Sequence, residues 1–259
     1  MSAPRDPTQR FSDRALDYVR GRPGYPPALL DLLAERCGLG RESTVADLGS
    51  GTGIFSELLL QRAGRVYAVE PNEAMAAAAR ERLGGLPGFV DVRGRAEDTT
   101  LPAAAVDMAT AAQALHWFAP EATRQELARI LKPEGFAVAV WNSRRTDSTE
   151  FLRAYEDLLQ RWGTDYAAVH RPAREDGAVQ ALFPGGRFET AVLPSTQRLD
   201  REGLRARLLS SSYVPAADDP RRPIMIEDLD ALFARHQQGG AVSMDYDTEV
   251  FWGRRADLL

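Results

Sequence analysis

The residues best suited to bind a small polar molecule lie in one turn, where three glycines alternate with small side chains. The run 44–48 reads Thr-Val-Ala-Asp-Leu, Gly49, Gly51 and Gly53 follow it, and an apolar helical pattern begins at Ile54. Glycine lets the chain turn sharply and lets a ligand touch main-chain atoms. The amide groups at the start of the next helix favour an anionic ligand group. This turn therefore predicts a binding site for a small polar ligand.

The spacing of the glycines separates two classes of ligand. The dinucleotide-binding fingerprint is G-x-G-x-x-G, and Ile54 stands where its third glycine would fall. An acid, Asp47, followed by three alternating glycines instead resembles the first motif of class I S-adenosylmethionine-dependent methyltransferases. The resemblance implies S-adenosyl-L-methionine as cofactor and S-adenosyl-L-homocysteine as product. An NAD-dependent oxidoreductase stays open as an alternative, and so does a non-catalytic regulatory protein that binds the cofactor.

Three further predicted strands also end in polar segments, as a sheet with its ligand at the strand carboxyl ends requires. Glu70 ends the strand 65–70 and is placed to hydrogen bond a ribose diol, while the strands 89–94 and 106–111 run into 96–98 and 113–118. The resemblance implies that these strand ends share one cofactor, whose contacts are then Asp47, Gly49, Ser50, Gly51, Thr52, Gly53, Glu70, Pro71, Asn72, Met75, Ala96, Glu97, Asp98, Gln113 and Ala114.

Individual roles within this set are also implied by the resemblance. Asp47 would anchor the methionine side of the cofactor, although an acid in a turn can equally stabilise the turn itself. Asp98 would accept from the adenine amino group, and Met75 would pack on the adenine face. Met75 can instead be an ordinary core residue, and Glu97 with Asp98 can be plain solvated loop.

The N-terminal segment is similar to that of the trans-aconitate-methyltransferase-like branch of the family, through Phe11, Tyr18, Arg22-Pro23 and Tyr25-Pro26. In that branch the segment lies over the cofactor. Tyr18 and Arg22 would then meet the cofactor carboxylate, because the planar guanidinium matches a carboxylate with two hydrogen bonds. A solvated arginine on an amphipathic helix is the competing interpretation.

Candidates for the acceptor side follow the fourth and fifth strands. His116 is expected where donor methyl and acceptor meet, as a base or as a residue that only shapes the pocket. Trp117 and Trp141 would wall the acceptor pocket, with Tyr25 beside them, or lie in the core. Arg144 would clamp an acidic acceptor. Methyl transfer itself needs positioning more than a catalytic dyad, and the acceptor group can be a carboxylate, a hydroxyl or an amine.

The order of the predicted elements indicates an α/β fold. Five strands alternate with helices up to residue 142, which favours a doubly wound, Rossmann-like sheet. Two late alternating segments, 188–193 and 242–252, would complete a mostly parallel seven-stranded sheet with an antiparallel last strand. We expect residues 1–40 to form a helical cap over the cofactor and 41–259 to form the cofactor-binding domain, with helical lid insertions near 144–186 and 201–237.

The net charge, the cysteine count and the hydropathy of the chain limit the kinds of partner and compartment that we expect. The chain has 259 residues, a formal net charge of −5 and one cysteine, Cys37. Acidity argues against nucleic acid or an anionic membrane as partner, a lone cysteine fits a reducing compartment, and no apolar run approaches the roughly 20 residues that span a bilayer. The three histidines lie in no metal-ligand motif. We expect a cytoplasmic monomer or homodimer that uses no metal and acts on a small-molecule methyl acceptor.

Overall fold

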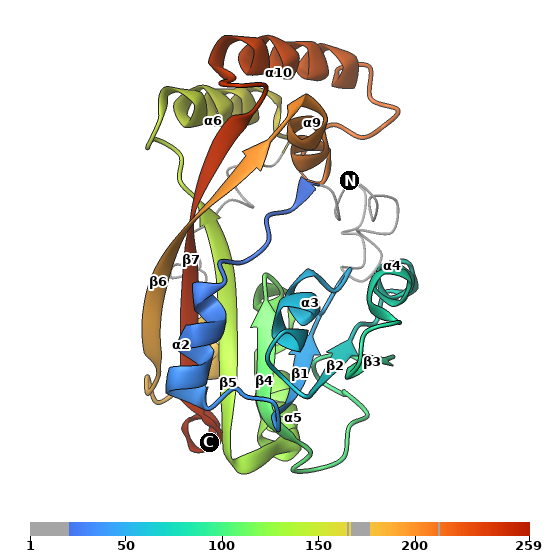
Figure 1. Cartoon of the computed structure of the whole chain (residues 1–259), viewed down its shortest axis with the longest axis vertical. Helices are drawn as coiled ribbons and strands as arrows, with labels where there is room; N and C mark the ends of the chain where they lie inside the picture. The colour runs from blue at the N-terminus through green and yellow to red at the C-terminus, as the bar shows by residue number, and fades with distance from the viewer. Residues whose placement is uncertain (1–20, 165, 167–176, 212) are drawn as a thin grey trace.

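A seven-stranded mixed sheet forms the centre of the computed structural model, which describes residues 21–164, 166, 177–211 and 213–259 (Figure 1). The strands are β1 (Thr44–Leu48), β2 (Arg65–Val69), β3 (Phe89–Val92), β4 (Val106–Ala112), β5 (Leu131–Arg144), β6 (Glu189–Leu199) and β7 (Val242–Arg254). Their order is β3-β2-β1-β4-β5-β7-β6, and only β7 runs opposite to its neighbours. The predicted α/β fold with an antiparallel last strand is confirmed.

Helices cover both faces of the parallel part of the sheet, because its strands are apolar on both sides. On one face α2 (Ala28–Cys37) and α3 (Ile54–Leu60) pack over β1 and β5, and α4 (Glu73–Leu83) lies beside the start of α3. On the other face lie α5 (Pro120–Ile130) and α8 (Ala178–Leu182). The short helices η3 (Leu115–Trp117) and η5 (Arg255–Leu258) complete this layer. These layers hold the strand carboxyl ends in fixed positions.

Helix α2, which falls within the segment expected to form the N-terminal cap, packs on the sheet. Leu29 and Leu33 are fully buried and belong to the same apolar cluster as Val45 of β1. A helix whose leucines are buried against the sheet is a layer of the domain and not a cover over its ligand edge. We therefore group α2 with the sheet, while the cap expected over residues 1–40 stays a prediction, since residues 1–20 lie outside the described part of the chain.

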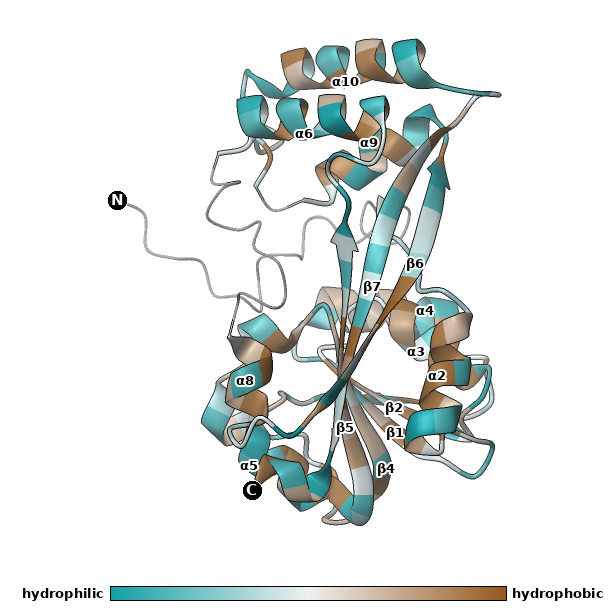
Figure 2. Ribbon diagram, turned by 90° about the vertical axis from the view of Figure 1, so that its left-hand side faces the viewer, coloured by the Kyte–Doolittle hydropathy of each residue, from teal (hydrophilic) through white to brown (hydrophobic). Residues whose placement is uncertain are grey.

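The strands β5, β6 and β7 extend well past the ends of β1 to β4, and three helices pack on the extension. These are α6 (Glu150–Trp162), α9 (Arg201–Leu209) and α10 (Arg222–His236), which we call the lid (Figures 1 and 2). Thr149 and Asp200 begin α6 and α9 by accepting hydrogen bonds from backbone amides three residues later, as helix N-caps do. The lid helices fall within the segments 144–186 and 201–237.

Residues 21–25 connect the lid to the sheet. Gln197 of β6 donates to the Gly21 carbonyl, Arg22 donates to the Ser210 carbonyl at the end of α9, and the Asn142 amide on β5 donates to the Gly24 carbonyl. The segment ends where Tyr25 packs edge-on against Phe55 of α3, with ring centroids 4.8 Å apart. Tyr18 lies outside the described residues. Within the described part of the chain, no helix combines the length and apolarity that crossing a bilayer requires.

Candidate cofactor and acceptor site

The three glycines after β1 serve different purposes. All three have positive φ, 62° at Gly49, 57° at Gly51 and 77° at Gly53, which favours glycine. A Cβ on Gly49 would lie 2.9 Å from the Ala114 Cβ, and one on Gly53 would lie 2.6 Å from a Leu83 methyl group. No described atom would come within 4 Å of a Cβ on Gly51. Packing therefore requires the outer glycines, and Gly51 alone faces open space that a ligand can enter.

Glu70 joins this loop to the end of β2. One carboxylate oxygen accepts from the Gly51 amide at 2.9 Å and the other accepts from the Asn72 amide at 2.8 Å. Glu70 is only 7% exposed, and burial raises the pKa of its carboxyl, opposed by the two amide hydrogen bonds. Each carboxylate oxygen can accept a second hydrogen bond. Glu70 is thus held at the place where a ribose diol is expected.

Two hydroxyl groups of the same loop lack a partner among the described residues. The Oγ of Ser50 and the Oγ1 of Thr52 are both buried and make no hydrogen bond there. Buried polar atoms usually have a partner, so these hydroxyls need a ligand or water. Together with the open side of Gly51 and the acceptor oxygens of Glu70, they fit a polar cofactor with hydroxyl and amino groups.

Asp47 lies beneath the loop and braces it. Its carboxylate accepts from the Ser56 hydroxyl of α3 at 2.6 Å and from the Thr110 hydroxyl of β4 at 3.0 Å. The side chain is fully buried, and desolvation raises its pKa to about 6, opposed by these hydroxyl bonds. Asp47 therefore ties β1, α3 and β4 together directly. Its contact with the methionine side of a cofactor stays a prediction.

The residues after β2 form a capped helix start. Asn72 accepts from the Met75 amide at 3.1 Å and begins α4, as its side-chain type favours. Met75 is 4% exposed, and Pro71 is partly buried between the strand and the helix. This geometry holds Glu70 rigidly, while the adenine contact of Met75 stays a prediction.

The turn after β3 is closed by its own backbone. Arg95 and Asp98 exchange amide hydrogen bonds of 3.0 and 3.1 Å, so Ala96 is buried while the Asp98 side chain is exposed. The carboxylate of Glu97 accepts from the Ala119 amide at 2.8 Å, just before α5. Glu97 thereby links two loops at the ligand edge of the sheet.

The segment after β4 is where the sequence predicts that the cofactor methyl group and the acceptor meet. Gln113 has a φ of 56°, unusual for a residue with a side chain, and its side-chain amide donates to the Asn142 carbonyl of β5 at 3.2 Å. Ala114 is buried against Gly49. His116 is exposed, with its ring centroid 4.8 Å from that of the half-buried Trp117. From this segment Ala114 and Phe118 lie closest to Gly49, and the acceptor roles of His116 and Trp117 stay predictions.

Trp141 and Arg144, two of the predicted acceptor contacts, lie in different surroundings. Trp141 is 7% exposed and packs edge-on against Phe251 at 5.8 Å, in the apolar cluster beneath α5 and α8. Successive strand residues point to opposite faces, so Trp141 faces the core while Asn142 faces the lid side. Arg144 pairs through Nη2 with Glu156 at 2.5 Å, while its Nη1 has no described partner, so its contact with an acidic acceptor stays a prediction. Tyr25 packs on Phe55 at the edge of the core.

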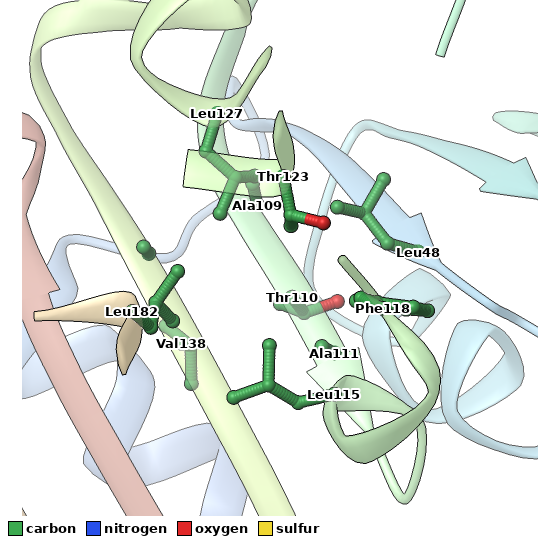
Figure 3. A pocket seen from close by; sticks show the side chains of 11 residues that line it. Leu48, Ala109, Thr110, Ala111, Leu115, Phe118, Thr123, Leu127, Val138 and Leu182 are labelled. Atoms are coloured by element: carbon green, nitrogen blue, oxygen red, sulfur yellow. The ribbon is translucent and has the colours of Figure 1, made fainter. Parts of the chain in front are cut away.

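A small cavity under β4 belongs to the core and not to the site. Its volume is about 10 Å³, the size of one water molecule. Leu48, Leu115, Phe118 and Leu182 are among its apolar lining (Figure 3). The Thr123 hydroxyl beside it is buried without a described partner. The cavity is too small for a cofactor.

Comparisons with known proteins agree with this geometry. Residues 46–139 match the methyltransferase domain family. An uncharacterised methyltransferase-like protein of Schizosaccharomyces pombe is 27% identical over 249 residues, which cover 93% of each chain. An uncharacterised methyltransferase of Mycobacterium tuberculosis is 38% identical over 61% of this chain, which spans 62% of that relative. The structure of a protein described as a type II methyltransferase from Anaeromyxobacter dehalogenans superimposes with a TM-score of 0.69 at 28% identity, covering 90% of this chain and 98% of the other.

Residues 46–139 therefore match a methyltransferase domain, and the whole chain is similar to proteins described as methyltransferases. The matched residues run from β1 to the middle of β5, so they include the carboxyl ends of β1 to β4. S-adenosylmethionine is the cofactor of this methyltransferase, and the loop, Glu70 and the strand ends fit it. The oxidoreductase alternative is set aside accordingly.

Sequence analysis missed one group of residues in this methyltransferase. Arg207 of α9 is buried beside Tyr246 of β7 and Tyr155 of α6. A signal was present: Arg207 lies three residues after Leu204 and one before Leu208, both fully buried, so it falls on the apolar side of its helix. An arginine at such a position needs a polar partner in the interior.

Proposed function

We propose that this methyltransferase moves the methyl group of S-adenosylmethionine to a small-molecule acceptor by in-line displacement. The acceptor atom belongs to a carboxylate, a hydroxyl or an amine. The reaction takes place at the carboxyl ends of β1 and β4, beneath the lid. This is the place where ligands bind in open α/β sheets, at the point where the strand order reverses.

One contact carries the proposal: the 2.9 Å hydrogen bond from the Gly51 amide to Glu70. It joins the glycine loop after β1 to the acid that ends β2. One rigid unit can therefore contact both the ribose and the methionine part of the cofactor. The unpartnered hydroxyls of Ser50 and Thr52 support the same location. Within this scheme Arg22 stays the candidate for the cofactor carboxylate.

The residues of the chain need mainly to bind the cofactor, orient the acceptor and exclude water. When bound, the cofactor would supply a methyl group on a positively charged sulfur, and the neutral thioether of S-adenosylhomocysteine would be the leaving group. Glu70 orients the ribose, and the loop amides hold the cofactor in place. Gln113, fixed on the Asn142 carbonyl, sets the path of the chain toward His116 and Trp117. These two rings would bound the acceptor and exclude water, which aligns nucleophile and methyl group.

Binding and turnover test the proposal separately. Calorimetric titration of the purified full chain with S-adenosylmethionine, S-adenosylhomocysteine and NAD is expected to give binding of the first two only. Release of S-adenosylhomocysteine is then followed over a panel of acids, alcohols and amines. A preference for NAD would refute the proposal, whereas cofactor binding without turnover on any acceptor would favour the regulatory alternative.

Several finer predictions belong with this proposal. The trans-aconitate-like branch, the cytoplasmic location and the monomeric or homodimeric state stay predictions. Within the described residues, no three His, Cys, Asp or Glu side chains gather as metal ligands would, and independence from metals also stays a prediction. Activity after treatment with a chelator would test it.

A further inference from the structure

Two arginines and two tyrosines meet between the lid and the extended strands. Arg144 of β5 stands opposite Tyr246 of β7 in the sheet register. The Nε of Arg207 donates to the Tyr246 hydroxyl at 3.1 Å, and the Arg144 guanidinium carbon lies 5.2 Å from the ring centroid of Tyr155. We call these four side chains the arginine–tyrosine cluster. They come from β5, β7, α6 and α9, so the fold itself gathers them (Figure 1).

The cluster carries more positive charge than the described residues around it neutralise. Arg144 is 8% exposed and pairs through Nη2 with Glu156 and the Tyr166 hydroxyl. Arg207 is 7% exposed, and its described partners are the hydroxyls of Tyr246 and Ser211, so within the described chain it forms no ion pair. A buried guanidinium without an anion is unfavourable, because it has lost water and gained no opposite charge.

Several hydrogen-bond donors in the cluster have no described acceptor. The Nη1 of Arg144 and the hydroxyl of Tyr155 are both buried and make no hydrogen bond to the described residues. Arg207 uses Nε and Nη1, and no bond from its Nη2 to a described residue is present. Burial raises the pKa of Tyr155, so its hydroxyl stays neutral and can donate. Unmet donors around an unneutralised cation are what an oxyanion requires.

The cluster lies a short distance from the reaction side. Arg144 is two residues beyond Asn142 on the same face of β5, roughly 7 Å along the strand. The Asn142 carbonyl accepts from Gln113, at the end of β4. A group bound to the cluster would therefore sit on the lid side of the place where the proposed function puts the acceptor.

We propose that Arg207, the Nη1 of Arg144 and the Tyr155 hydroxyl bind an anionic oxygen group of the methyl acceptor, a carboxylate or a phosphate ester. The acceptor is then a small organic anion held by its charged end under the lid, with the methylated atom directed toward β4. This inference rests on the proposed function for the identity of the ligand as acceptor. The anion site itself rests only on the cluster.

Calorimetric titration with two simple probes tests the site, using the full chain saturated with S-adenosylhomocysteine. Succinate represents a carboxylate source and inorganic phosphate a phosphate source. We expect at least one probe to bind the wild-type protein, and Arg207→Gln to weaken that binding at least tenfold. Arg205→Gln is the matched control, because Arg205 lies on the same helix but pairs with Asp230 near the surface. The control is expected to bind the probe within twofold of wild type.

A structural role for Arg207 would give different results. Arg207→Gln would then lower the melting temperature and leave probe binding unchanged at temperatures where the variant is folded, which would overturn the inference. If Arg207→Gln fails to fold, Tyr155→Phe removes only an unpartnered hydroxyl and is expected to weaken probe binding severalfold at an unchanged melting temperature. Equal binding by Tyr155→Phe and wild type, or no binding of either probe to wild type, would also overturn it.

The two proposals fail separately. Each anionic acceptor of the turnover panel is paired with its neutral amide or its dephosphorylated form. Methylation of neutral members alone would overturn the anionic acceptor and leave the methyltransferase function intact. Probe binding that depends on Arg207, in a protein that does not bind S-adenosylmethionine, would support the anion site and overturn the proposed function.

Discussion

At the scale of single residues, Glu70 makes the most consequential contact of the site. It fixes the glycine loop through Gly51 and caps its own turn through Asn72. Glu70→Ala is expected to weaken S-adenosylmethionine binding by about 1–3 kcal/mol, the cost of losing a charged hydrogen-bond acceptor. Calorimetry measures this. Glu73→Ala is the control, since Glu73 pairs with Arg80 and Arg93 on the surface; equal affinities of the Glu70 variant and wild type would place the ribose elsewhere.

His116 offers a sharper question about mechanism. It is exposed beside Trp117, a setting that suits a residue shaping the mouth of a pocket. His116→Ala is expected to reduce kcat/KM by at most about tenfold and to leave the pH profile of kcat unchanged, because positioning dominates methyl transfer. Steady-state kinetics between pH 6 and 9, roughly the range in which a histidine base would titrate, measures this. Loss of an ionisation from the profile would instead identify His116 as a base.

Asp47 links the site to stability. Its pKa is raised from 3.8 to about 6 by burial, so the folded protein holds this proton more tightly than the unfolded chain. The contribution of Asp47 to the free energy of unfolding therefore falls as the pH rises between those two values, by at most about 3 kcal/mol. Asp47→Asn should remove this fall. Urea unfolding of both proteins from pH 4 to 7 measures it, and parallel curves would contradict the prediction.

At the scale of elements, the glycine loop divides its work between packing and binding. Gly49 and Gly51 have similar φ values, so alanine at either costs roughly 1–2 kcal/mol in backbone strain. Gly49→Ala adds a clash with Ala114 and Phe118 and is expected to lower the melting temperature further. Gly51→Ala is expected to lose cofactor affinity instead. Thermal melts and calorimetry on the pair measure both effects, and identical behaviour of the two variants would refute the division.

Most elements could be predicted from the sequence, including the late strands β6 and β7, whereas the surroundings of single side chains far from the glycine loop could not. Strand β1 follows the local apolar pattern, and α4 begins at its Asn72 cap. Trp141 shows why prediction weakens later: a strand that is apolar on both faces gives no sign of which side chain faces the ligand. Arg144 shows the same limit, because its partner Glu156 lies on another element and only the folded chain joins them.

At the scale of the whole molecule, the lid has its own apolar core. The cluster around Leu152, Leu208 and Leu229 is separate from the two clusters that pack the sheet. Leu229→Ala is expected to cost about 2–5 kcal/mol, the usual cost of a buried leucine, and the loss should fall on the lid. Hydrogen exchange should show reduced protection in α6, α9 and α10 with β1 to β4 unchanged. Uniform loss over the sheet would show one cooperative unit.

Affinity for S-adenosylmethionine should survive in that variant, because the loop and Glu70 belong to the sheet. Methyl transfer should fall, since the lid carries Arg207, which we propose to hold the acceptor. Measuring both in one preparation separates the lid from the cofactor site.

Gly21 packs directly against the backbone of α9, so it limits how closely α9 approaches the segment 21–25. A methyl group on Gly21 would lie 2.4 Å from backbone atoms of Ala206 and Arg207, and backbone at that distance must move as a body. The close approach of this segment to α9 thus requires glycine at position 21. Gly21→Ala is therefore expected to move α9, together with Arg207, away from β7. The range of acceptors that bind should change as a result.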